Sequence, residues 1–117
     1  MRKFYVKIDT NDADYIGKLV DVEDEDVEKW LPLIEKIKNF KPYIGESKSG
    51  SKWTHSHNFP YGDVFRDDLG EKGPCELYNI TEDELYEFIE TFSLYGGEYG
   101  FHTITEITEI NIVKRIL

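Results

Sequence analysis

Two stretches of the chain place apolar residues at steps of three and four, the repeat of an amphipathic α-helix. A helix with a single apolar stripe must bury that stripe, so the rest of the chain has to supply a second apolar layer. The first stripe consists of Val27, Trp30, Leu31, Ile34, Ile37 and Phe40. The second consists of Leu85, Phe88, Ile89 and Phe92.

The ends of these two helices also carry signals. Thr81 followed by Glu84 predicts a capping box at the start of the second helix, and Gly96 with Gly97 predicts its end. Pro32 lacks the amide hydrogen that a helix interior needs. The first helix is therefore expected either to begin near residue 29 or to kink at Pro32.

The second layer is predicted to be a sheet. Residues 3–9 alternate between apolar and polar side chains, and 15–22 is rich enough in β-branched residues to return as the second strand of a hairpin. Residues 99–117 favour strands as well. Their isoleucines are spaced by three, however, which predicts a bulge or a break near Glu106.

The order of these elements predicts an α+β fold: a single domain over residues 1–117, with a mainly antiparallel sheet and both amphipathic helices packed on one of its faces. Residues 43–78 are expected to form an irregular loop region, in which 45–52 is a mobile connector. Cys75 is expected to be a small buried apolar residue. The predicted core comprises Phe4, Val6, Ile8, Trp30, Leu31, Ile34, Ile37, Leu85, Phe88, Ile89, Phe92, Ile110 and Ile112.

The charge of the chain limits its partners. With 24 acidic and 14 basic residues the formal net charge is −10, which would repel nucleic-acid phosphates. Direct nucleic-acid binding is therefore not expected, whereas a basic protein is a suitable partner. The acidic residues that begin the two helices are the expected contacts, namely Asp24, Asp26, Glu82 and Asp83.

The expected cellular compartment follows from the apolar runs, the first residues and the cysteine count. No apolar run is long enough to span a bilayer, the first residues lack the apolar region of a signal peptide, and one cysteine cannot form an internal disulfide. We therefore expect a cytoplasmic protein without membrane contact. The oligomeric state is left open.

Residues 52–63 hold two histidines and three aromatic residues in a segment with no helical or strand period. Such a segment suits a metal site, a small-ligand pocket or a loop packed on itself, and these alternatives remain open. His102 matters to this segment only if folding brings it beside His57. The candidate binding residues here are Trp53, His55, His57, Phe59, Tyr61 and His102.

The run Trp53-Thr54-His55-Ser56-His57 resembles the His-Ser/Thr-His segment of the JAMM (JAB/MPN-type) zinc isopeptidases. The resemblance covers only a short segment, and Phe65 and Asn58 replace the serine and proline of the motif. It implies zinc held by His55, His57 and Asp68, with a zinc-bound water that attacks an amide.

Three functions are therefore carried forward. The first is a small acidic, non-enzymatic protein that needs no cofactor and docks on, or inhibits, a larger and more basic macromolecule, as small proteins of phages and mobile elements do. The second is small-ligand binding by the Trp53–Tyr61 segment. The third is zinc-dependent amide hydrolysis of the JAMM type, for which no general base is evident.

Overall fold

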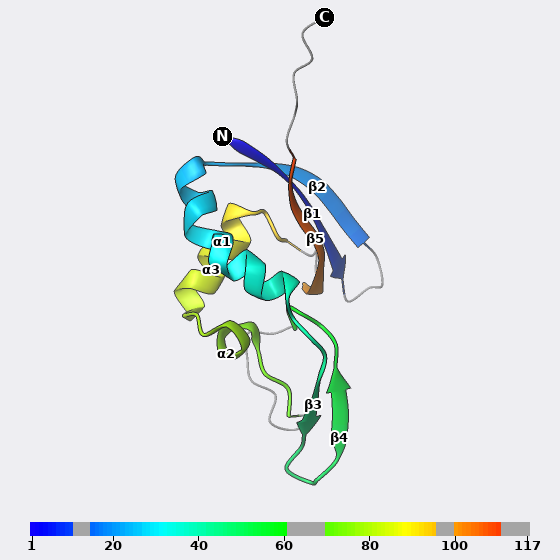
Figure 1. Ribbon diagram of the computed structural model, residues 1–117. Helices are drawn as coiled ribbons and strands as arrows, with labels where there is room; N and C mark the ends of the chain where they lie inside the picture. The colour runs from blue at the N-terminus through cyan, green and yellow to red at the C-terminus, as the bar shows by residue number, and fades with distance from the viewer. Residues whose placement is uncertain (11–14, 61–69, 96–99, 111–117) are drawn as a thin grey trace, which may run out of the picture.

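The computed structural model describes residues 1–10, 15–60, 70–95 and 100–110, and it confirms the α+β fold (Figure 1). A three-stranded antiparallel sheet has the order β2-β1-β5, and a separate two-stranded sheet pairs β3 with β4. The elements are β1 (Arg2–Thr10), β2 (Tyr15–Val22), α1 (Asp24–Lys38), β3 (Tyr43–Glu46), β4 (Lys52–His55), α2 (Pro74–Tyr78), α3 (Glu82–Thr91) and β5 (Phe101–Ile110).

The predicted N-terminal hairpin is confirmed as β1 and β2, and β1 is the central strand of the three-stranded sheet. Its alternate residues Phe4, Val6 and Ile8 are buried. In Figure 1 α1 and α3 lie together on one side of this sheet, as expected. The apolar stripes of the helices and the inner face of the sheet therefore share one core.

The spacing of apolar residues in β5 results from two irregularities in its pairing with β1. Ile8 lies opposite Ile104 while Lys7 lies opposite Glu106, so Thr105 is an extra residue; a second shift leaves His102 extra. Each extra residue moves the alternation by one position. Phe101, Ile104 and Ile107 therefore all face the core at steps of three, and the predicted bulge near Glu106 is confirmed.

Helix α1 begins at Asp24 and continues through Pro32, so the expectation of a start near residue 29 is wrong. Its first turn is acidic, and negative side chains are favourable at the positive end of the helix dipole. Leu31 lies at the margin of the stripe and is only partly buried, whereas Leu33 belongs to the core.

Helix α3 starts as predicted. The Thr81 hydroxyl accepts from the amide of Glu84 at 3.1 Å, and the Glu84 carboxylate accepts from the amide of Thr81 at 3.0 Å. The predicted end is wrong, because the helix stops at Thr91, before Gly96 and Gly97, which lie outside the described residues. Ser93 takes the left-handed conformation there, and Leu94 donates its amide to the carbonyl of Ile89 at 2.8 Å.

The core is centred on aromatic residues. Phe88 is fully buried, and its ring centroid lies 5.4 Å from Trp30, 5.2 Å from Phe92 and 6.5 Å from Phe59. Leu31, Ile89 and Ile110 are only partly buried, and Ile112 lies outside the described residues. The predicted core residues that are buried are Phe4, Val6, Ile8, Trp30, Ile34, Ile37, Leu85, Phe88 and Phe92.

The region 43–78 is more regular than predicted, because it contains β3, β4 and α2. The expected connector 45–52 is the end of a hairpin, in which Ser47 and Ser51 exchange hydrogen bonds across the turn. A side chain at Gly45 would collide with the Gly70 carbonyl and with His55, so glycine lets the hairpin pack closely. Cys75 in α2 is partly buried.

Candidate functional site

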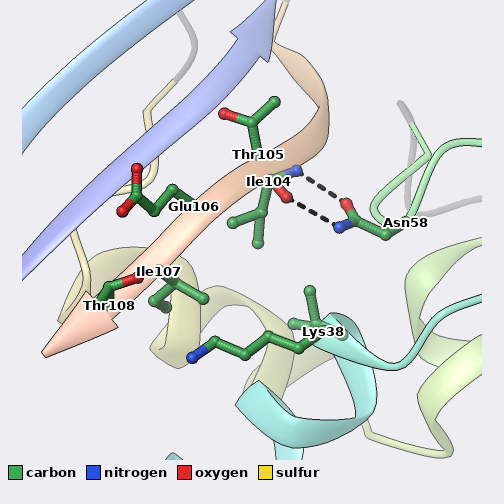
Figure 2. A pocket seen from close by; sticks show the side chains of 8 residues that line it. Lys38, Asn58, Ile104, Thr105, Glu106, Ile107 and Thr108 are labelled. Carbon is green, nitrogen blue, oxygen red and sulfur yellow. Dashed lines mark hydrogen bonds between the residues drawn. The ribbon is translucent and has the colours of Figure 1, made fainter.

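Residues 57–59 run beside the first half of β5 and attach the β3–β4 hairpin to the main sheet. The Asn58 side chain donates to the carbonyl of Ile104 at 2.9 Å and accepts from its amide at 2.8 Å (Figure 2). The Tyr78 hydroxyl donates to the Asn58 carbonyl, and the Phe59 amide donates to the His102 carbonyl at 3.0 Å. A side-chain amide thus takes the place of a neighbouring strand at Ile104.

This attachment brings His57 beside His102, the condition under which His102 was expected to matter. Their ring centroids are 4.1 Å apart, and the Thr103 hydroxyl lies 3.0 Å from Nδ1 of His57 and 3.1 Å from Nδ1 of His102. A hydroxyl donates only one hydrogen bond, so at most one of the two Nδ1 atoms accepts from Thr103, and the other donates to it. At least one of the two rings, when neutral, therefore carries its proton on Nδ1 and offers Nε2 as an acceptor.

The pKa of His57 is lowered from its ordinary value of 6.5, first by burial and next by the neighbouring His102. Glu71 and Asp9 act in the opposite direction and only partly compensate. The neutral imidazole of His57 is consequently favoured near pH 7.

His55 has different neighbours. Its ring is buried, lies 5.1 Å from the ring of Tyr43, and places Nδ1 3.9 Å from the Glu71 carboxylate. The Tyr43 hydroxyl accepts from the amide of Lys72 at 2.9 Å, and burial raises the pKa of Tyr43. His55 thus fastens the hairpin to the chain around Glu71.

The proposed zinc ligands are only partly placed. Asp68 lies outside the described residues, and within those residues no group of three His, Cys, Asp or Glu side chains is arranged to hold a metal ion. His55 and His57 each have other polar neighbours. The three-ligand set implied by the JAMM resemblance therefore stays a prediction.

The aromatic residues of the predicted binding segment are dispersed. Trp53 is 52% exposed on the hairpin, whereas Phe59 is buried and stacks on Phe101 with centroids 4.9 Å apart. Tyr61 lies outside the described residues. Among the described members of this set, Trp53 and His55 thus have separate surroundings, whereas the rings of His57 and His102 come together and the Phe59 amide contacts the His102 backbone.

Of the predicted acidic contacts, Asp24, Glu82 and Asp83 are exposed on the helices, and Asp26 is partly buried. Five carboxylates occur in each of α1 and α3, against three lysines in α1 and none in α3. The amino group of Lys29 contacts the Glu87 carboxylate at 2.7 Å, and Asp26 and Glu84 also help to raise the pKa of Lys29. The two outward sides therefore meet at Lys29. We call this surface the acidic helical face: Asp24, Glu25, Asp26, Glu28, Glu35, Glu82, Asp83, Glu84, Glu87 and Glu90.

A cavity that the sequence analysis missed lies between the end of α1 and β5 (Figure 2). Its volume is about 280 Å³. The three-residue apolar spacing in β5 was the available signal, since a bulged edge strand often borders a site. The lining residues are Ile37, Lys38, Asn58, Ile104, Thr105, Glu106, Ile107 and Thr108.

Comparisons of the chain with protein-family models, with curated proteins and with solved structures find no match. In the part of the chain that the structure describes, no helix has the length and apolar character needed to cross a membrane.

Proposed function

We propose that this chain is a non-enzymatic binding protein of the cytoplasm that docks on a larger and more basic protein. Docking of this kind can inhibit the partner when its basic surface is a channel that normally holds nucleic-acid phosphates. The observation that carries the proposal is the acidic helical face, where the carboxylates of α1 and α3 outnumber the lysines and adjoin one another at Lys29.

Charge and rigidity both suit this face to docking. Its carboxylates stand on two helices whose buried sides meet through Trp30 and Phe88, so the charges are held in a fixed arrangement. A fixed acidic surface accelerates encounter with a basic partner and discriminates against acidic ones. Tyr86 on α3 is 53% exposed and adds an aromatic side chain of the kind that interfaces favour.

The test is affinity capture from a host lysate followed by a kinetic measurement on the recovered partner. The association rate should fall steeply between low salt and about 0.5 M salt, because the screening length is about 10 Å at 0.1 M and shrinks as salt rises. Replacing Glu25 and Glu90 by lysine should slow association further, since both side chains are exposed on the acidic helical face.

The matched control replaces Glu46 and Glu76 by lysine. These carboxylates are also exposed but lie on β3 and α2, and the change in net charge is the same. Equal slowing by both double variants would show that only net charge matters. Association that ignores salt and both pairs of substitutions would refute docking by the acidic helical face.

A second candidate function is small-ligand binding at His57 and His102, favoured by the 4.1 Å approach of their rings. The acceptor that this arrangement leaves at an Nε2 atom suits a planar polar molecule that carries a hydrogen-bond donor. Native mass spectrometry of protein from its own host tests this candidate. A retained small molecule that is lost in His57→Gln would support it, and the absence of any adduct would count against it.

A further inference from the structure

Among the described residues, no strand or loop pairs with the outer edge of β5 along its second half. In the described part of the chain β5 is an edge strand of the three-stranded sheet, because the order is β2-β1-β5. Residues 57–59 cover this edge only at His102 and Ile104. Beyond Ile104 the edge borders the cavity beneath the end of α1.

The pairing with β1 shows which backbone groups face outward on this edge. Ile104 lies opposite Ile8 and gives both its amide and its carbonyl to Asn58, so its backbone groups point away from β1. Val6 and Phe4 are two and four residues from Ile8 on β1, so their backbone groups point in the same direction as those of Ile8. Val6 lies opposite Ile107, and Phe4 lies opposite Glu109. In an antiparallel ladder such residues direct both backbone groups to the same side.

The amides and carbonyls of Ile107 and Glu109 therefore point to the outer edge. These two amides and two carbonyls follow one another along the edge, next to the Asn58 side chain, which already bonds to Ile104 as a strand would. Such a row of backbone groups is a template for one more strand. A strand that lay beside β5 beyond Asn58 would hydrogen-bond to the amides and carbonyls of Ile107 and Glu109.

Side chains of an added strand would alternate between two environments. Those on the inner side would enter the cavity beside Ile37, which at about 280 Å³ is far larger than the roughly 30 Å³ that one water occupies. Those on the outer side would pass the exposed Glu106. Apolar residues suit the first environment, and basic residues suit the second.

We propose that the open edge of β5, from Ile107 to Glu109, binds an extended segment of a partner protein in which apolar and basic residues alternate. The added strand hydrogen-bonds to the backbone of Ile107 and Glu109, its apolar side chains fill the cavity, and a basic side chain pairs with Glu106. The net charge of −10 favours a basic segment over an acidic one or a second copy of the chain. This site is separate from the acidic helical face and does not depend on it.

The test uses synthetic hexapeptides and amide NMR of the complete chain. The probe alternates lysine and valine; one control peptide alternates glutamate and valine, and another is the probe with alternate backbone nitrogens methylated. The probe should shift the amide signals of Ile107 and Glu109 and slow their exchange with solvent. The methylated peptide should lose most of this effect because it lacks the donors that an added strand needs.

Two protein variants change the charge beside the edge in opposite senses without touching the core. Glu106→Lys should weaken binding of the probe roughly tenfold, while Lys38→Glu, on the opposite wall of the cavity in Figure 2, should strengthen it. Glu76→Lys, on α2, makes the same change in net charge as Glu106→Lys and should leave binding nearly unchanged.

Several results would overturn the inference. Signal shifts confined to α1 and α3 would place the peptide on the acidic helical face, which supports the proposed function while removing the strand-addition site. Equal weakening by Glu106→Lys and Glu76→Lys would reduce binding to net charge. Concentration-dependent shifts of Ile107 and Glu109 without peptide would identify a second copy as the occupant.

Discussion

Replacement of Phe88 by alanine tests the architecture at its centre. The side chain is fully buried, and truncating a buried phenylalanine costs about 3 to 5 kcal/mol of unfolding free energy. Because Phe88 also contacts Trp30, Phe92 and Phe59, each a pair of the kind worth about 0.5 to 1.5 kcal/mol beyond burial, the upper part of that range is expected.

A loss of about 4 kcal/mol is a large part of the roughly 5 to 15 kcal/mol that stabilises an ordinary domain. At about 4 °C per kcal/mol for a chain of this size, the unfolding temperature should fall by about 16 °C. Urea titration followed by tryptophan fluorescence measures the free energy directly, since Trp30 is in contact with Phe88.

Phe88→Leu keeps most of the apolar volume and should cost about 1 to 2 kcal/mol, so it provides a measurement if the alanine variant does not fold. Glu90→Ala, at an exposed position of the same helix, should change stability by less than about 0.5 kcal/mol. If Phe88→Ala costs less than about 1 kcal/mol, Phe88 is not at the centre of the core and the packing of α3 on the sheet is wrong.

Three further outcomes are expected. Asn58→Ala should lower the unfolding free energy by about 1 to 3 kcal/mol in urea titration, because it removes two hydrogen bonds to Ile104; an unchanged midpoint would show that water replaces them fully. His57 has a lowered pKa when folded, so its neutral form contributes stability that is complete above about pH 6.5 and is lost as pH falls through the folded pKa. The thermal midpoint of His57→Gln should therefore fall less than that of the parent between pH 7.5 and 5.5, and parallel profiles would contradict this. Elemental analysis of protein purified without chelator or a metal-affinity column should show no stoichiometric zinc; zinc that is present and lost in His57→Ala would instead favour the hydrolase.

The elements that could be predicted from the sequence are those with local signals. The capping box of Thr81 and Glu84 is made within one turn of helix, and the alternation of residues 3–9 needs only one buried face. The bulge in β5 was also visible, because isoleucines at steps of three cannot all face one side of a regular strand. In each case a few neighbouring residues determine the outcome.

The rest depends on contacts between distant residues. Ser93 takes the left-handed conformation without a glycine because Leu94 is drawn into the core, and no neighbouring residue predicts that. Hairpin β3–β4 is held by the chain around Gly70 and Glu71 rather than by its own pattern. The open edge of β5 could not be predicted either, since it depends on where Asn58 attaches.

The pairing of β1 with β5 has a consequence for the order in which the protein folds during synthesis. Lys3 pairs with Ile110, so the central strand is made well before its second neighbour and waits while all the elements between them are synthesised. At about 5 to 20 residues per second that delay lasts several seconds, in which the β1–β2 hairpin and α1 can form but one edge of β1 stays unpaired. Closing so long a loop also slows folding of the released chain. Ribosome-bound chains that end before Phe101 should therefore bind chaperones and be cleaved rapidly by proteases, whereas chains that extend past Ile110 and have cleared the exit tunnel should resist them.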